Sequence, residues 1–137
     1  MIFVDSNVPM YLVGGDHPHK SDAQRILERL ASQRRRLVTS SEVFQEILHR
    51  YAFIDRRDAI QPAFDVLRGV VDEVFAVEEA DVMVAKDLIC ARTEFSARDA
   101  LHVAVMRRRE VSEILSFDRG FDEVGEIARL PAPAPRS

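Results

Sequence analysis

The first five residues place the strongest constraint on the fold, because an apolar run of strand length ends directly in an acidic residue. Ile2, Phe3 and Val4 follow one another without a polar residue between them, and Asp5 comes next. An uninterrupted apolar run is typical of a parallel strand with both faces covered, and open α/β sheets bind ligands beyond the carboxyl ends of such strands. A carboxylate beside the core needs a compensating partner. We therefore expect the functional site at Asp5.

Segments with strand character alternate with amphipathic segments along the chain. Short apolar runs predict strands at residues 2–4, 36–39, 74–77 and 114–116, and a final edge strand at 127–130. Apolar residues at helical spacing predict helices near residues 20–32, 41–51, 55–71, 78–89 and 96–109. This alternation, without an internal repeat or linker, predicts one α/β domain over residues 1–130 whose helices flank a central, mainly parallel sheet. The first strand is expected at its centre, and the proline-rich residues 131–137 are expected to be disordered.

The last two predicted helices carry the clearest local signals. Ser96 can cap the final helix, with Asp99 three residues later, and the helix ends in a run of arginines as its dipole prefers. The preceding helix opens with the acids Glu78 and Glu79 and is expected to bury a face that includes Val82.

Composition excludes several classes of protein. The net charge of −4 gives no overall basic surface for nucleic acid, although all basic residues except Lys20 and Lys86 are arginines, and clusters such as Arg34–Arg36 and Arg107–Arg109 could form a local positive rim. A single cysteine, Cys90, cannot form an internal disulfide and favours a reducing compartment. No signal-peptide pattern and no apolar run of membrane-spanning length is present. The sequence therefore favours a cytoplasmic location.

Acidic residues follow predicted strands or begin predicted helices at four places in the chain. They are Asp5, Glu42 or Glu46, Asp99 and Asp118. Carboxylates that converge raise one another's pKa values, whereas a hard divalent cation with oxygen ligands reverses that balance. This pattern favours a site for Mg²⁺ or Mn²⁺.

Zinc is disfavoured by the remaining residue types. There is no cysteine pair, and the four histidines show no ligand spacing of the H-x-x-x-H kind. His17 and His19 are interpreted as loop residues.

Each acid also has a structural interpretation when it is considered alone. Asp99 can be the second half of a capping box, Asp118 a turn residue, and Glu42 and Glu46 acids on a helix surface. Asp5 has no such interpretation, because a buried strand seldom ends in a carboxylate without a functional reason. Its presence strengthens the functional interpretation of the other acids together.

Four motifs in order along the chain resemble one family. They are Phe3–Val8 (F-V-D-S-N-V), Ser40–Glu46 (S-S-E-V-F-Q-E), Ala97–His102 (A-R-D-A-L-H) and Leu115–Phe121 (L-S-F-D-R-G-F). Together they resemble PIN domains, and among these the VapC-type ribonuclease toxins of toxin-antitoxin pairs. Residues 8–19 are expected to hold a short helix and then a loop. Pro9 departs from the aliphatic residue that is commoner after the opening motif, which affects only the start of this short helix.

The resemblance implies both a set of site residues and an activity. The metal-binding acids would be Asp5, Glu46, Asp99 and Asp118, with Ser6, Asn7 and Ser116 as polar groups around them. Glu46 is preferred to Glu42 because the family's acid precedes an aliphatic pair, as it does in Glu46-Ile47-Leu48; Asp122 is left open as a further acid. The family also implies Mg²⁺-dependent RNA hydrolysis by metal-activated water, a cognate VapB-like antitoxin as partner, and a homodimer.

Two alternatives of other classes remain. A phosphatase that uses Asp5 as its nucleophile needs a second acid two residues later, where this chain has Asn7, and a lysine near the later strands. A catalytically inactive PIN-like binding module would be indicated by the loss of one of the four acids, and all four are present.

Overall fold

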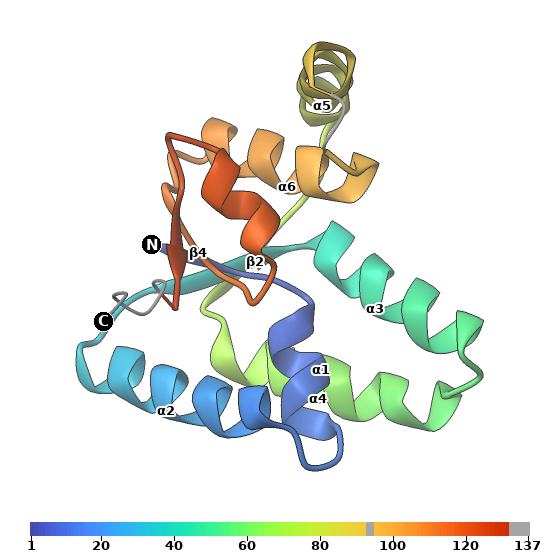
Figure 1. Ribbon diagram of the computed structural model, residues 1–137, viewed down its shortest axis with the longest axis vertical. Coiled ribbons are helices and arrows are strands. Elements are labelled where there is room, and N and C mark those ends of the chain that lie inside the picture. The colour runs from blue at the N-terminus through green and yellow to red at the C-terminus, as the bar shows by residue number, and fades with distance from the viewer. Residues whose placement is uncertain (93–94, 132–137) are drawn as a thin grey trace.

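The computed structural model describes residues 1–92 and 95–131 of the chain (Figure 1). Its centre is a five-stranded sheet with the order β3-β2-β1-β4-β5, in which every neighbouring pair is parallel. The strands are β1 (Ile2–Val4), β2 (Leu37–Ser40), β3 (Glu73–Phe75), β4 (Glu113–Leu115) and β5 (Ala128–Leu130). The predicted parallel sheet is confirmed, with the first strand at its centre and the last at its edge.

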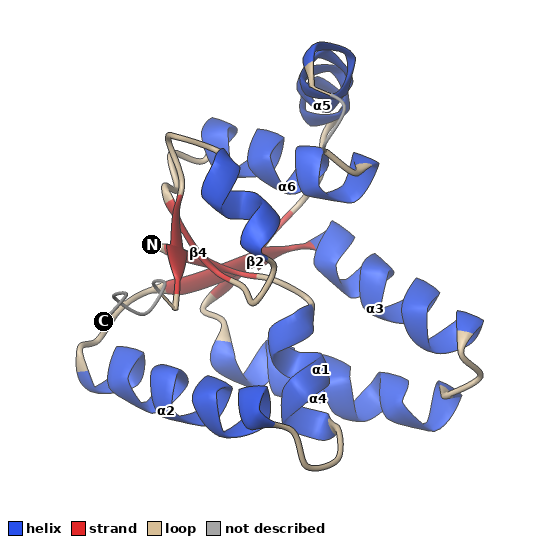
Figure 2. Cartoon of the chain, viewed as in Figure 1, coloured by secondary structure: helices blue, strands red, loops and turns tan. Residues whose placement is uncertain are grey.

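Six α-helices flank the sheet and make a three-layer α/β arrangement, as predicted (Figure 2). The helices are α1 (Asn7–Val13), α2 (Pro18–Ser32), α3 (Ser41–Phe53), α4 (Ile60–Val70), α5 (Glu79–Ala91) and α6 (Ala97–Arg108), and two short 3₁₀ helices are η1 (Arg57–Ala59) and η2 (Arg119–Glu123). In Figure 1, α1, α2 and α4 lie on one side of the sheet and α6 on the other, with α5 outside α6. None of the helices within residues 1–92 and 95–131 is long and apolar enough to cross a membrane.

The structure corrects two helix predictions. The helix α2 begins at Pro18, so that His17 is its N-cap and His19 lies inside it, where the sequence predicted a loop. The α-helix predicted over residues 55–71 begins later, at Ile60, because Asp55 adopts a left-handed backbone conformation with φ 56° and residues 57–59 form the 3₁₀ helix η1. Pro62 lies in the first turn of α4, where the missing N–H removes no intrahelical hydrogen bond.

The orientation of α5 also differs from the prediction. Val82, which was expected to be buried, has 49% of its surface exposed, whereas Asp81 beside it is 1% exposed. The reason is that α5 packs against α6 and does not reach the sheet (Figure 1). Only a narrow face of α5, which includes Ala85, is therefore buried.

Parallel strands bring their carboxyl ends to the same edge of the sheet, and this positions the site. The backbone N–H of Asp5 donates to the carbonyl of Leu115 at 3.0 Å, so β1 and β4 stay paired up to the residues that follow them. Thr39 donates its hydroxyl to the carbonyl of Val4 at 2.8 Å and ties β2 to the same place. Residues 132–137, predicted to be disordered, lie outside the described residues.

Candidate metal centre

Asp5 is a buried carboxylate held in one orientation by neighbouring polar groups. Its side chain accepts a hydrogen bond from the backbone N–H of Ser6 at 2.7 Å, from the hydroxyl of Ser116 at 2.7 Å and from the amide of Asn7 at 3.5 Å. Only 4% of the residue is exposed. These contacts come from the start of α1 and the end of β4, so the fold fixes the carboxylate before any ligand arrives.

Glu46 on α3 and His102 on α6 complete the buried part of the site. Nε2 of His102 lies 3.7 Å from Oδ1 of Asp5 and 3.7 Å from Oε1 of Glu46, which is an ion-pair distance and too long for a hydrogen bond. The hydroxyl of Ser6 donates to Oε1 of Glu46. One atom each from Asp5, Glu46 and His102 lie within 4.8 Å of one another, as a metal site requires.

Burial and mutual charge shift the protonation of these groups. Burial, with the charge of Glu46, raises the pKa of Asp5, although His102, Ser116 and Ser6 oppose the shift. Burial also disfavours the ionised form of Glu46, but His102 and Ser6 outweigh it and hold its pKa below the usual value. Burial would lower the pKa of His102, and the carboxylates of Glu46 and Asp5 raise it instead. The imidazole of His102 therefore lies between two carboxylates whose charges influence its pKa, and its own charge influences theirs.

Asp99 and Asp118 lie at the outer part of the same site. Asp99 sits in the first turn of α6, where its backbone N–H donates to the hydroxyl of the cap Ser96 at 3.1 Å. Burial, followed by the charges of Asp118 and Asp5, raises the pKa of Asp99 to about 6. Asp118 is the N-cap of η2, and its side chain accepts a hydrogen bond from the N–H of Gly120 at 2.8 Å. Asp99 is therefore a partly buried carboxyl with two acidic neighbours.

All four predicted acids line one hollow of about 360 Å³. Its lining consists of Asp5, Ser6, Asn7, Met10, Tyr11, Glu46, Arg50, Tyr51, Ile54, Asp99 and Asp118. A second hollow of about 530 Å³ adjoins it and is lined by Glu46, Ser96, Ala97, Arg98, Asp99 and Asp118. Three acids are thus accessible from both sides, so an extended ligand could pass over them.

The structure separates the other predicted residues into two groups. Ser6, Asn7 and Ser116 surround Asp5: the amide of Asn7 also donates to the hydroxyl of Ser116 at 3.2 Å, and that hydroxyl accepts from the N–H of Asp118 at 3.0 Å. Glu42, one turn before Glu46, does not line the hollow that holds the acids.

Asp122 is placed away from this hollow and has a partner of its own. Its carboxylate accepts two hydrogen bonds from the buried Arg129 on β5, at 2.8 and 3.0 Å, and this partner lowers its pKa. The same guanidinium donates to the carbonyl of Ser116 at 3.2 Å and so supports the turn after β4.

His102 is the residue that sequence reasoning missed. The spacings between the four histidines show no metal-site pattern. The informative spacing is the one between His102 and Asp99, which are three residues apart. Residues three apart lie on the same face of a helix, so Asp99 at the site predicts that His102 points to it as well. A test of the four histidines against the predicted acids would have found it.

The donor set fits a hard divalent cation. Both ring nitrogens of His102 are buried and have no hydrogen-bond partner within residues 1–92 and 95–131, and the acids around them contribute only oxygen atoms. The four acids that line the hollow bring together negative charge that a divalent cation would neutralise.

Comparison with known proteins identifies the family. A family model described as PIN domain matches residues 2–127. The chain belongs to the PIN-domain family. The VapC ribonuclease Mb1869c of Mycobacterium bovis and ribonuclease VapC13 of Mycobacterium tuberculosis are each 58% identical to it over 130 residues, which cover 95% of this chain and 99% of the relative. Ribonuclease VapC23 of M. tuberculosis is 42% identical over 118 residues, covering 86% of this chain and 93% of that protein.

Solved structures agree with this assignment. VapC20 of M. tuberculosis, described as a toxin that cleaves the sarcin-ricin loop, matches with a TM-score of 0.73 and 25% identity, covering 91% of this chain and 95% of that one. VapBC2 of Rickettsia felis matches with a TM-score of 0.71, covering 94% and 97%; at 14% identity it shows the fold alone. The predicted membership of the PIN-domain family, among the VapC ribonucleases, is confirmed. PIN nucleases depend on divalent metal ions, and the cluster of Asp5, Glu46 and His102 could hold one.

Proposed function

We propose that this PIN domain is an endoribonuclease that uses Mg²⁺ or Mn²⁺ and acts as the toxin of a VapBC-type pair. The observation that carries the proposal is the convergence of Asp5, Glu46, Asp99 and Asp118 on one hollow, where the pKa of Asp99 is raised to about 6. Relatives that are 58% identical over nearly the whole chain are named ribonucleases, which supports RNA as the substrate. The adjoining hollow shares Glu46, Asp99 and Asp118 with the first, which offers room for an extended substrate beside the acids.

The residues of the site divide the work between them. The four carboxylates would hold the cation, and Ser6, Asn7 and Ser116 keep the carboxylate of Asp5 directed into the hollow. When bound, a divalent cation supplies an activated water and neutralises charge on the scissile phosphate. His102 lowers the repulsion between Asp5 and Glu46, so that both stay in place while the site has no other cation. Arg98 in the adjoining hollow is available to a substrate phosphate.

The decisive test is cleavage of total RNA by the purified chain in Mg²⁺, with mapping of the ends. We expect 5′-phosphate and 3′-hydroxyl products from the wild type and none from Glu46→Gln. The matched control is Glu42→Gln, on the same helix one turn earlier and outside the hollow. Undiminished cleavage by both variants would refute the proposal, and loss of cleavage in Glu42→Gln alone would show that the two glutamates had been assigned wrongly.

The identity of the metal is tested by the same assay. A site built from carboxylate oxygens suits both Mg²⁺ and Mn²⁺. We expect activity with both ions and none after removal of divalent ions with EDTA. Activity with Zn²⁺ alone would contradict the assignment.

An antitoxin is the proposed protein partner, and the hollow suggests where it binds. Beside the acids the lining is apolar, with Met10, Tyr51 and Ile54, of which Ile54 is 53% exposed. The nearby rings of Phe44 on α3 and Phe64 on α4 are less accessible to a partner, because their centroids lie 4.9 Å apart and both rings pack against the core. A C-terminal antitoxin segment that folds on binding would cover the apolar wall and bring a basic residue to the acids.

The test for the antitoxin is co-expression with the small protein encoded next to this chain. We expect a stable complex on size exclusion that no longer cleaves RNA, and Ile54→Arg should weaken this complex. A neighbour that neither binds nor inhibits would contradict the toxin-antitoxin assignment and leave the nuclease assignment intact.

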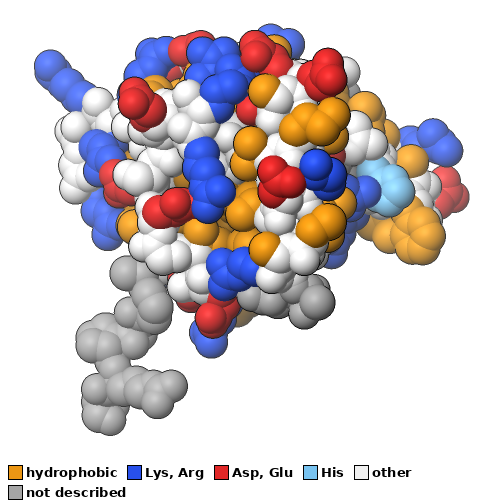
Figure 3. Space-filling model, turned by 90° about the horizontal axis from the view of Figure 1, so that it is seen from above, with side chains coloured by type: hydrophobic (Ala, Val, Ile, Leu, Met, Phe, Trp, Pro, Cys, Tyr) orange, Lys and Arg blue, Asp and Glu red, His pale blue; other side chains and the backbone are white. Residues whose placement is uncertain are grey.

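A homodimer contact is proposed on the outer surface of α5 and α6. An apolar hollow of about 340 Å³ there is lined by Val82, Ala85, Lys86, Ile89, Cys90, Ala97 and Leu101. In the space-filling view from above, hydrophobic side chains lie between charged ones on this side of the molecule (Figure 3). Val82→Arg is expected to shift the mass in solution from dimer to monomer, as measured by light scattering. A wild-type monomer would contradict the proposal.

A further inference from the structure

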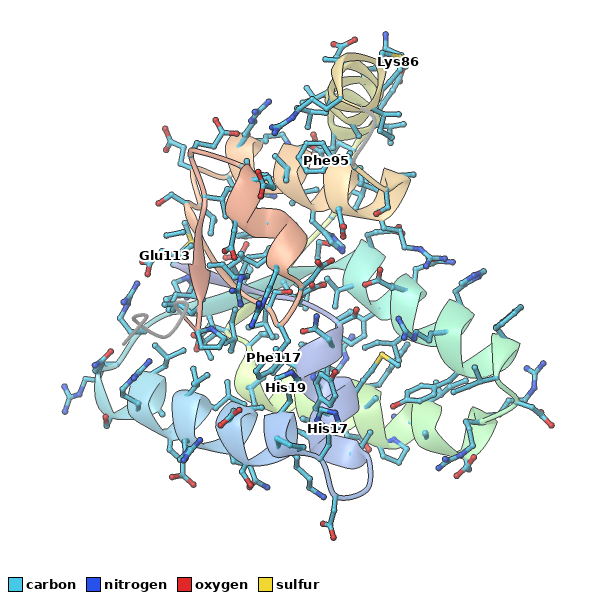
Figure 4. The ribbon with its side chains drawn as sticks, in the orientation of Figure 1. His17, His19, Lys86, Phe95, Glu113 and Phe117 are labelled. Carbon is cyan, nitrogen blue, oxygen red and sulfur yellow. The ribbon has the colours of Figure 1, made fainter. Side chains whose placement is uncertain are left out.

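Four aromatic and imidazole rings gather beside the metal centre. Tyr11 stacks on His17 with ring centroids 4.8 Å apart, and His19 stacks on Phe117 at 4.3 Å. The edge of Tyr11 meets Phe117 at 5.4 Å and His19 at 5.1 Å, which joins the two stacked pairs. Figure 4 shows His17, His19 and Phe117 together where α1, the start of α2 and the loop after β4 meet. We call Tyr11, His17, His19 and Phe117 the ring cluster.

Short contacts tie the ring cluster to the metal-binding residues. Tyr11 lies one helical turn after Asn7 on α1, so both face the loop that follows β4. The backbone N–H of Phe117 donates to Oδ1 of Asn7 at 3.3 Å, and Phe117 lies in the chain between Ser116 and Asp118. The same loop and helix therefore position both the acids and the rings, at a fixed distance from each other.

The ring cluster also separates two hollows. Tyr11 lines the hollow that contains the four acids. His17, on which it stacks, lines a neighbouring open hollow of about 510 Å³ together with Asp16, Pro18, Lys20, Ser21 and Gln24. A strand that left the acids in this direction would cross Tyr11 and His17 and then reach the ammonium group of Lys20.

Burial distinguishes these rings from those of the core. Phe3 and Phe121 are 0% and 1% exposed, whereas His17 is exposed and Tyr11, His19 and Phe117 are only partly buried. Rings used for packing are normally covered, and partly exposed rings beside a basic group are the arrangement by which proteins bind single-stranded nucleic acid, because each base offers a flat face for stacking.

We propose that the ring cluster is a stacking site for an unpaired nucleobase next to the scissile phosphate, and that Tyr11 is the residue on which the base stacks. The proposal rests on the ribonuclease function proposed above and adds the residues that position the RNA. A base inside a duplex is covered on both faces by its neighbours and cannot stack on Tyr11 or His17 without being unstacked first. Stacking on these rings therefore positions an unpaired nucleotide and requires no particular base.

The test compares Tyr11→Leu with Tyr11→Phe on a short single-stranded RNA of mapped cleavage site. Loss of the ring should lower kcat/KM about tenfold, and the phenylalanine should restore it to within about twofold of wild type. A second measurement compares kcat/KM for two further substrates. Each is the same RNA with one abasic nucleotide, placed on one or the other side of the cleavage site. One abasic position should slow the wild type about tenfold and leave Tyr11→Leu unchanged, because that variant has already lost the stacking partner.

Two controls separate stacking from damage to the fold. Phe53→Leu removes a ring that is 84% exposed at the end of α3 and should cleave like the wild type. The rise of melting temperature on addition of Mg²⁺ should be the same in Tyr11→Leu as in the wild type, because the acids are intact. If Tyr11→Leu had lost its structure, its melting temperature would not rise on addition of Mg²⁺. In that case the response of Tyr11→Phe to the abasic substrates would still test stacking.

Three results would overturn the proposal. They are equal kcat/KM for Tyr11→Leu and wild type, equal sensitivity of both to every abasic position, and cleavage of a duplex as fast as of the single strand. If the wild type cleaves RNA and one of these results is found, the stacking role fails and the nuclease function stands. If the wild type cleaves no RNA in Mg²⁺ or Mn²⁺, both fail.

Discussion

Asp5 and Asp81 are both buried carboxylates, but the chain compensates them differently. Asp81 on α5 is 1% exposed and accepts two hydrogen bonds from the guanidinium of Arg108, at 2.7 and 2.9 Å, and one from the backbone N–H of Glu78 at 2.8 Å. Asp5 has hydroxyl, amide and backbone donors, but the nearby imidazole of His102 is shared with Glu46. Asp81 therefore pairs with the guanidinium of Arg108, whereas Asp5 shares the imidazole of His102 with a second carboxylate.

Their protonation follows from this difference. Burial would raise the pKa of Asp81, but the bidentate contact with Arg108 outweighs it and lowers the pKa. For Asp5 burial prevails and the pKa is raised. A buried acid with a complete partner in its own chain stabilises the fold, whereas one with an incomplete partner is available to an external cation. The comparison predicts that changes at the two acids affect different properties.

The largest expected effect is on catalysis at Asp5. Asp5→Asn should lower the rate of RNA cleavage on the order of a thousandfold, which corresponds to about 4 kcal/mol of transition-state stabilisation. In the absence of metal the variant should melt at the same temperature as the wild type or higher, because a repulsive charge has been removed. Initial rates and calorimetry measure the two effects. A large fall in melting temperature would mean that Asp5 is structural, like Asp81.

The opposite result is expected at Asp81. Asp81→Ala removes the partner of Arg108 and the cap of α5, and should lower the free energy of unfolding by about 2 kcal/mol. Urea denaturation measures this change. Cleavage per folded molecule should not change, because α5 lies outside α6 and away from the acids. Loss of specific activity would show that α5 supports the site.

Metal binding should distinguish the two regions directly. Mg²⁺ at ten times its dissociation constant should stabilise the wild type by about 1.4 kcal/mol, because it binds only the folded state. Asp99→Asn should reduce the rise in melting temperature, and Asp81→Ala should retain it in full. A rise of equal size in all three proteins would place the cation elsewhere.

The smallest effect is the pH dependence of the metal-free protein. The pKa of Asp99 is about 6 in the folded state, against an ordinary value of 3.8, so the folded state holds a proton that the unfolded state releases between these values. Stability should therefore fall as pH rises from about 4 to 6, by about 1 kcal/mol after allowance for the partial exposure of Asp99. His102, whose pKa is also raised, contributes a constant amount in this window and loses it only at higher pH. Urea denaturation of Asp99→Asn without metal should show a flatter profile than the wild type; identical profiles would contradict the assignment.

Local patterns predicted the elements that depend on nearest neighbours in the chain. The apolar run of β1, the cap at Ser96 and the order of strands and helices all follow from propensity and spacing. The motifs around Asp5, Glu46, Asp99 and Asp118 were sufficient to propose the site residues, and the structure puts all four on one hollow. The ends of α2 and α4 were predicted less well, because helix ends depend on single residues such as His17 and Asp55.

Other properties depended on packing between distant segments. Glu42 and Glu46 share one side of α3, and only the crossing of α3 over α6 brings Glu46 and His102 together. The sequence left Asp122 open as a further site acid, and the structure pairs it with Arg129 on β5. The sequence also predicted that Val82 is buried, and the structure exposes it because α5 lies outside α6. The charged partner of a buried carboxylate decides whether that carboxylate stabilises the fold or is available to bind a cation. This partner lies far from the carboxylate in the sequence. The sequence by itself therefore determined the type of fold and the candidate acids, and the tertiary structure decided which acids lack a complete counter-charge.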